Sequence, residues 1–128
     1  MVQQVTNGIK ISAVSNFEGT SYRNYRLYYG FSYVITIENQ SNDTVQLIER
    51  HWNIFDSLNK KEIVEGDGVI GKKPVLKSAQ VYSYQSNCFL TSPVGAMNGY
   101  YTMVNFATTK NFKVYIPTFQ LMVPIMSN

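Results

Sequence analysis

Cysteine, histidine and tryptophan each occur only once in the 128 residues. The single cysteine, Cys88, excludes an intramolecular disulfide bond. Residues 1–10 lack the basic, apolar and small-residue regions of a secretory signal, so we expect a protein of the reducing cytoplasm. No apolar run approaches the roughly 20 residues that a helix needs to span a bilayer. We therefore expect no membrane segment.

Charged residues are scarce, at 15% of the chain, and the basic ones are scattered. The formal charge of +3 and the isoelectric point near 9.0 would tolerate an anionic partner, but no basic stripe of the kind that binds nucleic acid is present. The basic residues fall into separate groups: Arg23 and Arg26; Lys60 and Lys61; Lys72, Lys73 and Lys77; Lys110 and Lys113. We do not expect nucleic acid as a partner.

Aromatic residues are abundant, with ten tyrosines and seven phenylalanines. They favour strands over helices, and no window shows helical periodicity. The clearest pattern is a period of two from Leu27 to Ile37, with one apolar and one largely polar face, which is typical of an antiparallel strand with one face in solvent. The polar stretch Ser15–Arg23 is predicted to be a loop. The secondary structure of Val75–Ala79 cannot be assigned from its pattern. Further strands are predicted at Ile9–Val14, Glu62–Glu65, Val81–Gln85, Met97–Phe106 and Phe112–Ile116.

The stretch Thr44–Asp56 carries the only tryptophan, Trp52, and is predicted to be the third strand. Read with a period of two, both of its faces are mixed. A buried indole removes roughly 150–250 Å² from water, so we place Trp52 at the centre of the core. About seven to eight strand candidates, with turn signals roughly every ten residues, predict an all-β fold. The predicted architecture is an immunoglobulin-like or fibronectin type III-like antiparallel β-sandwich, a single domain over residues 1–128.

The run Gly66-Asp67-Gly68-Val69-Ile70-Gly71 matches the G-x-G-x-x-G spelling of dinucleotide-binding turns. Pro74 follows too soon for the helix that those turns require, and Lys73 stands where a P-loop needs a hydroxyl group for magnesium. Nucleotide hydrolysis is therefore not predicted. We favour the interpretation that the glycines serve a loop that needs positive φ or close backbone contact. The alternative is an anion-binding nest of loop amides assisted by Lys72 and Lys73.

The sequence contains no recognisable set of catalytic or metal-binding residues. His51 has no second histidine or cysteine cluster with which to form a zinc site or a catalytic pair, and Cys88 is expected to be a buried, small apolar residue. Four acidic residues near one turn do not have the spacing of an EF-hand, so a solvated turn is favoured over loose cation binding; they are Asp56, Glu62, Glu65 and Asp67. We predict no catalytic residue, no metal and no cofactor.

A combination of residues spread over the chain matches a known family. They are Tyr29, Phe31, Tyr33, Ile35, Ile37 and Asn39; Val45, Gln46 and Leu47 with Arg50, His51 and Trp52; Gly66 to Gly71 with Pro74, Val75 and Leu76; Cys88, Leu90, Pro93, Gly95, Met97, Gly99 and Tyr101; and Phe112, Val114, Ile116, Pro117, Phe119 and Leu121. From about Ile9 to Pro124 the chain resembles the ApaG family, whose domain also occurs in some F-box proteins and in a polymerase delta-interacting protein.

The resemblance implies a fibronectin type III-like or immunoglobulin-like sandwich and no catalytic residues. It also implies a link to cobalt resistance and magnesium efflux, described for the family in enteric bacteria, and to protein or ligand binding, described in eukaryotes.

We therefore expect a non-enzymatic binding module for a protein partner, with Gly66–Pro74, Arg50 and His51 as its contact region. The alternative is binding of a phosphate-bearing small molecule or nucleotide, without hydrolysis, at Gly66–Gly71. A third hypothesis is sensing of a divalent cation by the acidic residues between Asp56 and Asp67. The sequence leaves open whether an exposed edge strand pairs two copies into a homodimer.

Overall fold

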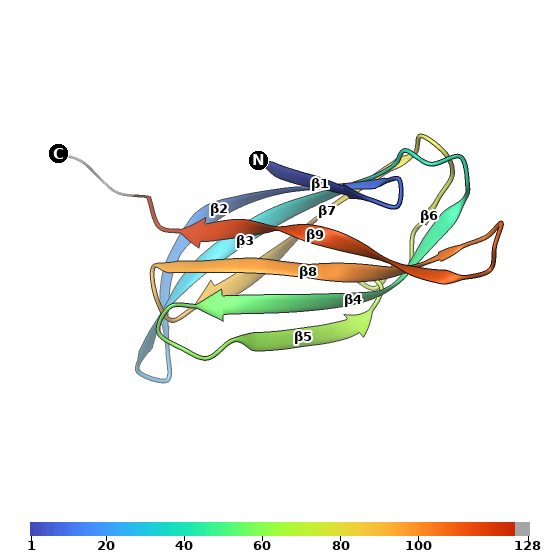
Figure 1. The fold of residues 1–128 in the computed structure, drawn as a ribbon. Helices are drawn as coiled ribbons and strands as arrows, with labels where there is room; N and C mark the ends of the chain where they lie inside the picture. Colours follow the sequence, from blue (N-terminus) through green and yellow to red (C-terminus); the bar gives the residue numbers. More distant parts are fainter. Residues whose placement is uncertain (125–128) are drawn as a thin grey trace.

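The computed structural model describes residues 1–124, which form two antiparallel β-sheets packed face to face (Figure 1). The first sheet has the order β1-β2-β3-β7, and the second has the order β5-β4-β8-β9, with β6 paired to β4. The strands are β1 (Val2–Thr6), β2 (Ile9–Arg23), β3 (Arg26–Asn39), β4 (Val45–Asp56), β5 (Glu62–Asp67), β6 (Val75–Leu76), β7 (Val81–Leu90), β8 (Val94–Asn105) and β9 (Asn111–Met122).

The predicted all-β sandwich is confirmed. With β1 and β6 set aside, the strands divide into a three-stranded sheet, β2-β3-β7, and a four-stranded sheet, β5-β4-β8-β9. These correspond to the A-B-E and C′-C-F-G sheets of immunoglobulin-like domains. Within residues 1–124 no helix is long and apolar enough to cross a membrane.

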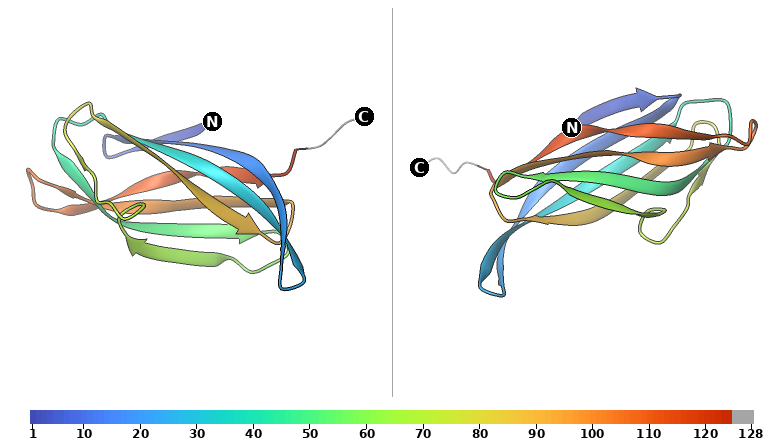
Figure 2. Two further views of the ribbon diagram at one scale, coloured as in Figure 1. Left: turned by 180° about the vertical axis from the view of Figure 1, so that it is seen from behind. Right: turned by 60° about the horizontal axis from the view of Figure 1, so that its bottom comes forward.

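The prediction of a loop at Ser15–Arg23 is wrong, because these residues continue β2. Here β2 and β3 extend beyond the sandwich as a two-stranded ribbon (Figure 2, right). Much of the ribbon is exposed, so its side chains lack the alternation of apolar and polar residues that marks a strand with one buried face. A two-residue turn with positive φ at Asn24 and Tyr25 joins the strands, which is the geometry of tight hairpins.

Strand β1 is also absent from the prediction, which recognised only the turn that follows it. Asn7 and Gly8 have φ of 50° and 79°, as the hairpin turn at an Asn-Gly pair requires. This turn folds Val2–Thr6 back onto β2. The described residues therefore form nine strands rather than seven to eight, and Trp52 lies on the fourth strand rather than the third.

A β-bulge in β4 explains why both faces of this strand are mixed in the sequence. Leu47 pairs with Met103 and Glu49 pairs with Thr102, so Ile48 is an extra residue. A bulge shifts the alternation by one position, and as a result Leu47 and Trp52, five positions apart, both lie in the core, at 1% and 3% exposure.

Trp52 lies at the centre of the core, as predicted. Its ring makes edge-on contacts with Tyr33, Tyr101 and Phe119, at centroid distances of 5.4, 6.5 and 6.0 Å. These three partners come from β3, β8 and β9, so the indole joins the two sheets.

The two long sides of the sandwich differ. On one side β9 lies against the hairpin of β1 and β2: Ser15 Oγ donates to the Gln120 carbonyl at 2.7 Å, and Asn7 Nδ2 donates to the Lys113 carbonyl at 3.2 Å. On the other side the edges are β7 and β5 (Figure 1), and within residues 1–124 no backbone hydrogen bond joins these two strands. The sandwich is therefore closed on one side and open on the other.

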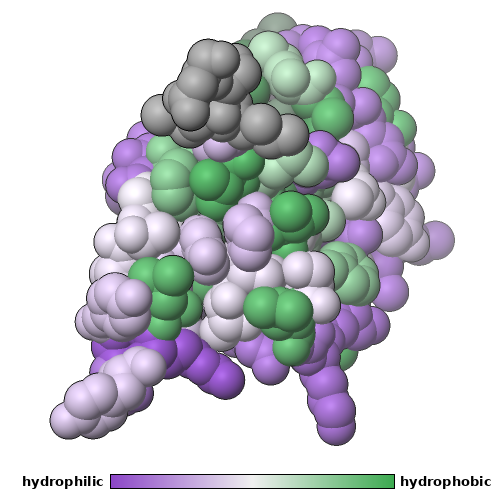
Figure 3. Space-filling model, turned by 90° about the vertical axis from the view of Figure 1, so that its left-hand side faces the viewer, coloured by the Kyte–Doolittle hydropathy of each residue, from purple (hydrophilic) through white to green (hydrophobic). Residues whose placement is uncertain are grey.

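Asp56 joins two turns at the end of the sandwich. Its Oδ2 accepts hydrogen bonds from the N–H and the Oγ1 hydroxyl of Thr91, both at 2.7 Å, and its Oδ1 accepts one from Ser92 Oγ at 2.6 Å. Burial alone would raise the pKa of this carboxyl, but the hydrogen bonds from Ser92 and Thr91 outweigh it and hold the pKa below the ordinary value of 3.8. Figure 3 views this end of the molecule, where apolar side chains form patches separated by polar ones.

The Asp56→Asn variant is expected to be less stable by about 1.5 kcal/mol at pH 7, because it loses charge-assisted hydrogen bonds. Since the pKa is lowered in the folded protein, the contribution of the carboxylate is present above about pH 4 and is lost as the pH falls through the folded-state value. Urea unfolding across this range should therefore show the two proteins converging in acid. Glu49→Gln, at an exposed residue of β4, is the control and should change stability little; a difference for Asp56→Asn that is independent of pH would contradict the assignment.

Candidate functional site

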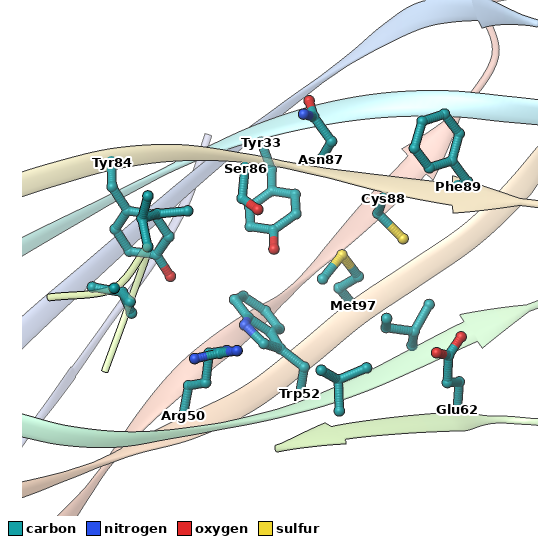
Figure 4. Close-up of a pocket in the computed structure, with 15 residues that line it drawn as sticks. Tyr33, Arg50, Trp52, Glu62, Tyr84, Ser86, Asn87, Cys88, Phe89 and Met97 are labelled. Atoms are coloured by element: carbon teal, nitrogen blue, oxygen red, sulfur yellow. The ribbon is translucent and has the colours of Figure 1, made fainter. Parts of the chain in front are cut away.

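A cleft of about 490 Å³ lies on the open side of the sandwich, between β7 and β5 (Figure 4). Its floor is formed by Tyr33, Trp52 and Met97 of the core. Side chains of β7 form one wall and side chains of β4 and β5 form the other; they include Tyr84, Ser86 and Cys88, and Ile54, Glu62 and Val64. The volume lies in the range of roughly 300–1,000 Å³ that is common for ligand-binding pockets.

Arg50 lies at one end of the cleft and Glu62 at the other (Figure 4). Nη1 of Arg50 donates to the carbonyl groups of Asp67 and Gly68, at 2.9 and 3.0 Å. Gly66 stands opposite Arg50 in the ladder, and a Cβ atom there would lie 2.7 Å from Arg50 Nη2. Gly66 thus leaves room for the guanidinium group, which forms no ion pair with any carboxylate of residues 1–124.

The glycine-rich run forms the end of β5 and a tight hairpin rather than a helix start. Val69 and Lys72 exchange backbone hydrogen bonds at 2.8 and 2.9 Å, and the two residues between them, Ile70 and Gly71, have φ of 48° and 72°. This is a two-residue turn of the type that favours Asn-Gly. A β-branched residue at positive φ is uncommon, and Ile70 is 58% exposed at the tip, where it lines the cleft.

Close backbone contact explains why residue 68 is a glycine, in agreement with the favoured interpretation of the motif. A Cβ atom at Gly68 would lie 2.2 Å from the Lys72 carbonyl oxygen, and its φ is +60°. The amides of Gly68, Val69 and Lys72 donate to backbone carbonyl groups. An anion-binding nest needs free amides. Between Gly68 and Lys72 only the amides of Ile70 and Gly71, at the tip, have no backbone partner within residues 1–124, so at most these two amides are available to a phosphate group.

The structure divides the residues predicted as a contact region. Arg50, Val69, Ile70 and Gly71 line the cleft, whereas Lys72 and Lys73 line a separate depression beside Pro74 and Tyr82. Gly66, Asp67 and Gly68 support the Arg50 end from behind through their backbone.

His51 lies on the outer face of its sheet, away from the cleft. Its ring stacks on Tyr100 at a centroid distance of 4.6 Å. Nδ1 lies 3.1 Å from Oε2 of Glu65, without hydrogen-bond alignment. Consecutive residues of a strand point to opposite faces. The sequence was therefore sufficient to predict that the side chains of Arg50 and His51 lie on opposite faces of the sheet.

The acidic residues between Asp56 and Asp67 do not come together. Asp56 is held by Thr91 and Ser92, Glu62 lines the cleft and Glu65 lies beside His51. No group of three metal-ligating side chains is present among the described residues.

The ionisable groups that β7 contributes to the cleft stay protonated at neutral pH. Burial raises the pKa of the Cys88 thiol to about 12, so a reactive thiolate is disfavoured. Burial also raises the pKa of Tyr84, whose hydroxyl is hydrogen-bonded to that of Tyr101. These groups provide a neutral, partly apolar wall. The cleft residues other than Arg50, Glu62 and the hairpin were not predicted as a site, because only the packing of the two sheets brings them together.

Two sheets in the immunoglobulin-like order, with a single indole between them and a cleft at one open side, define an antiparallel β-sandwich of the fibronectin type III-like class. The model of the ApaG domain matches residues 19–105. Protein ApaG of Methylobacterium nodulans is 39% identical over 126 residues, covering 98% of this chain and 96% of that protein. Protein ApaG of Vibrio cholerae is 45% identical over 98 residues, or 77% of each chain. The chain belongs to the ApaG family.

Solved structures are similar over almost the whole fold. The putative ApaA protein of Bordetella pertussis superposes with a TM-score of 0.84 at 29% identity, covering 98% of this chain and all of that one. The Northeast Structural Genomics Consortium target SoR45 superposes with a TM-score of 0.87 at 33% identity, covering 92% of this chain and 89% of that chain. The resemblance noted in the sequence is thus confirmed for family and fold.

Proposed function

We propose that the chain is a non-enzymatic cytoplasmic module that binds a protein partner through the cleft, with Arg50 and the hairpin Val69–Lys72 as the main contacts. The observation that carries the proposal is the Arg50 guanidinium group: it lines the cleft, is half-buried, and has only backbone carbonyl groups as partners within residues 1–124. Removing a charge from water is costly unless it is paired, and a carboxylate from a partner would supply the missing partner.

The composition of the cleft also supports a protein ligand. Tyrosine, phenylalanine and arginine are enriched at the centres of protein interfaces, and the cleft presents Tyr84, Phe89 and Arg50. Exposed apolar side chains lie at its margins, with Ile70 at 58% and Phe89 at 46% exposure.

Affinity capture from host lysate, with quantitative mass spectrometry, tests the proposal. Ile70→Asp and Arg50→Glu should each reduce recovery of the captured partner by about tenfold, the equivalent of 1.4 kcal/mol, because they remove an apolar contact and reverse a charge. The matched control is Ile63→Asp, a similarly exposed isoleucine (52%) that pairs with Asn53 on the outer face of β5. Equal recovery with all three variants and the unaltered protein would exclude the cleft as the binding site.

A further inference from the structure

Strand β7 lacks the features that protect other edge strands from pairing with another chain. Proteins usually blunt such edges with charged side chains, proline, bulges or short length. β7 has ten residues, no charged residue and no proline, and it pairs with β3 without a register shift. By contrast, β5 has six residues, three of them acidic, and β9 carries Pro117 beside a bulge and lies against β1. In Figure 2 (left) no strand follows β7 at the margin of its sheet.

The hydrogen-bond pattern shows which backbone groups of β7 face the open side. Asn39 donates its N–H to the Gln80 carbonyl, whereas Gln40 donates to Gly8 on the other side of β3. Because these directions alternate along an antiparallel ladder, the even-numbered residues of β7 pair with β3. The odd-numbered residues, including Gln85 and Asn87, direct their N–H and C=O groups outward. Within residues 1–124 these outward groups form no backbone hydrogen bond.

We propose that an extended segment of a partner protein adds to β7 as a further strand and covers the cleft. The inference rests on the proposed function, since it states how the cleft holds its partner. A strand beside β7 would pair with the outward groups of Gln85 and Asn87, and every second side chain would point toward the opposite sheet. There it meets the partly exposed apolar side chains of Ile54 and Val64, which lie beside the buried Trp52.

The charges at the two ends of the cleft indicate which residue types the partner's added strand carries. Arg50 pairs with Gly66, and Ile54 pairs with Glu62, so the Arg50 and Glu62 positions lie about 14 Å apart along the strands. An extended segment covers that distance in about four residues. The complementary segment carries an acidic residue at the Arg50 end, an apolar residue two positions away over Trp52, and a basic residue two positions further, at Glu62.

A phage-displayed library of random linear peptides provides the probe. Selection on the full chain should enrich peptides with acidic, apolar and basic residues at alternate positions. A synthetic peptide of the selected sequence should bind Gln85→Pro at least about tenfold more weakly, since this variant removes an outward N–H without breaking the ladder to β3. Gln85→Thr keeps the N–H group and is the matched control, with unchanged affinity. Arg50→Gln should weaken the peptide about tenfold, and should not weaken a peptide whose acidic residue is replaced by glutamine.

A second test uses the unaltered protein, so its result does not depend on whether the Gln85→Pro variant folds. In hydrogen exchange, the amides of Gln85 and Asn87 should exchange rapidly in the free protein and become protected when the peptide is added. Protection confined to the hairpin would show that β7 is not extended.

Three further results would overturn the inference. They are the absence of enriched peptides, peptides that bind Gln85→Pro as tightly as the unaltered protein, and a dimer in sedimentation that Gln85→Pro converts to a monomer, which would make a second copy of the chain the occupant. The proposed function is decided separately. If Ile70→Asp abolishes partner capture but Gln85→Pro does not, the cleft binds a protein in another manner.

Discussion

Replacement of Trp52 by alanine is expected to lower the free energy of unfolding by about 3–5 kcal/mol. The indole is 3% exposed and packs against aromatic rings from both sheets, including Tyr33 and Phe119. Its removal leaves a cavity between the two sheets, which can shrink only if the sheets move closer together and their other contacts rearrange. Urea unfolding followed by circular dichroism measures the loss independently of the missing tryptophan fluorescence.

Phe106→Ala is the matched control for this experiment. Phe106 is an aromatic residue that is 49% exposed, and its replacement should alter stability by about 0.5 kcal/mol or less. A loss below about 1 kcal/mol for Trp52→Ala would show that the indole does not join the sheets, and the cleft built on it would lose its floor.

Replacement of Gly68 by alanine is expected to cost about 2–5 kcal/mol. The new methyl group would lie 2.2 Å from the Lys72 carbonyl oxygen, and the residue has φ of +60°. The left-handed conformation alone costs roughly 1–2 kcal/mol for an L-residue, and overpacking adds about 1–3 kcal/mol. Thermal and urea unfolding measure the total.

Gly71→Ala separates these two contributions. Gly71 also has positive φ, at +72°, but a Cβ atom there would have nothing within 4 Å. Only the conformational cost of the left-handed backbone remains, about 1–2 kcal/mol. Equal losses for the two variants would mean that close backbone contact is not the reason for Gly68, and would reopen the anion-binding interpretation of the motif.

The sequence predicts those parts of the fold where one face of a strand is buried throughout. From Phe31 to Ile37, β3 keeps its alternation over a continuous buried face, so its pattern is unambiguous. The pattern fails where geometry interrupts it. In β4 the extra residue Ile48 moves Leu47 and Trp52 onto one face, and a bulge is not visible in the order of apolar residues alone. In β2, beyond about Ser15, exposure of the ribbon removes the signal.

The candidate site was only partly predictable for a different reason. The hairpin at Ile70 and Gly71 and the neighbouring Arg50 could be found because glycine and charge are local signals. The wall formed by Tyr84 and Cys88 could not, because it faces Arg50 only after β7 and β4 enter different sheets that pack together. The relative placement of sheets depends on long-range packing that a period of two does not encode.

The closed side of the sandwich constrains the order in which the molecule can assemble on the ribosome. Its hydrogen bonds join residues about as distant in the chain as they can be, Ser15 with Gln120 and Asn7 with Lys113. Chains emerge from the N-terminus at about 5–20 residues per second, so β1 and β2 must wait for β9. Until Gln120 has been translated, the N-terminal hairpin lacks its hydrogen bonds to β9, and this side of the first sheet stays uncovered.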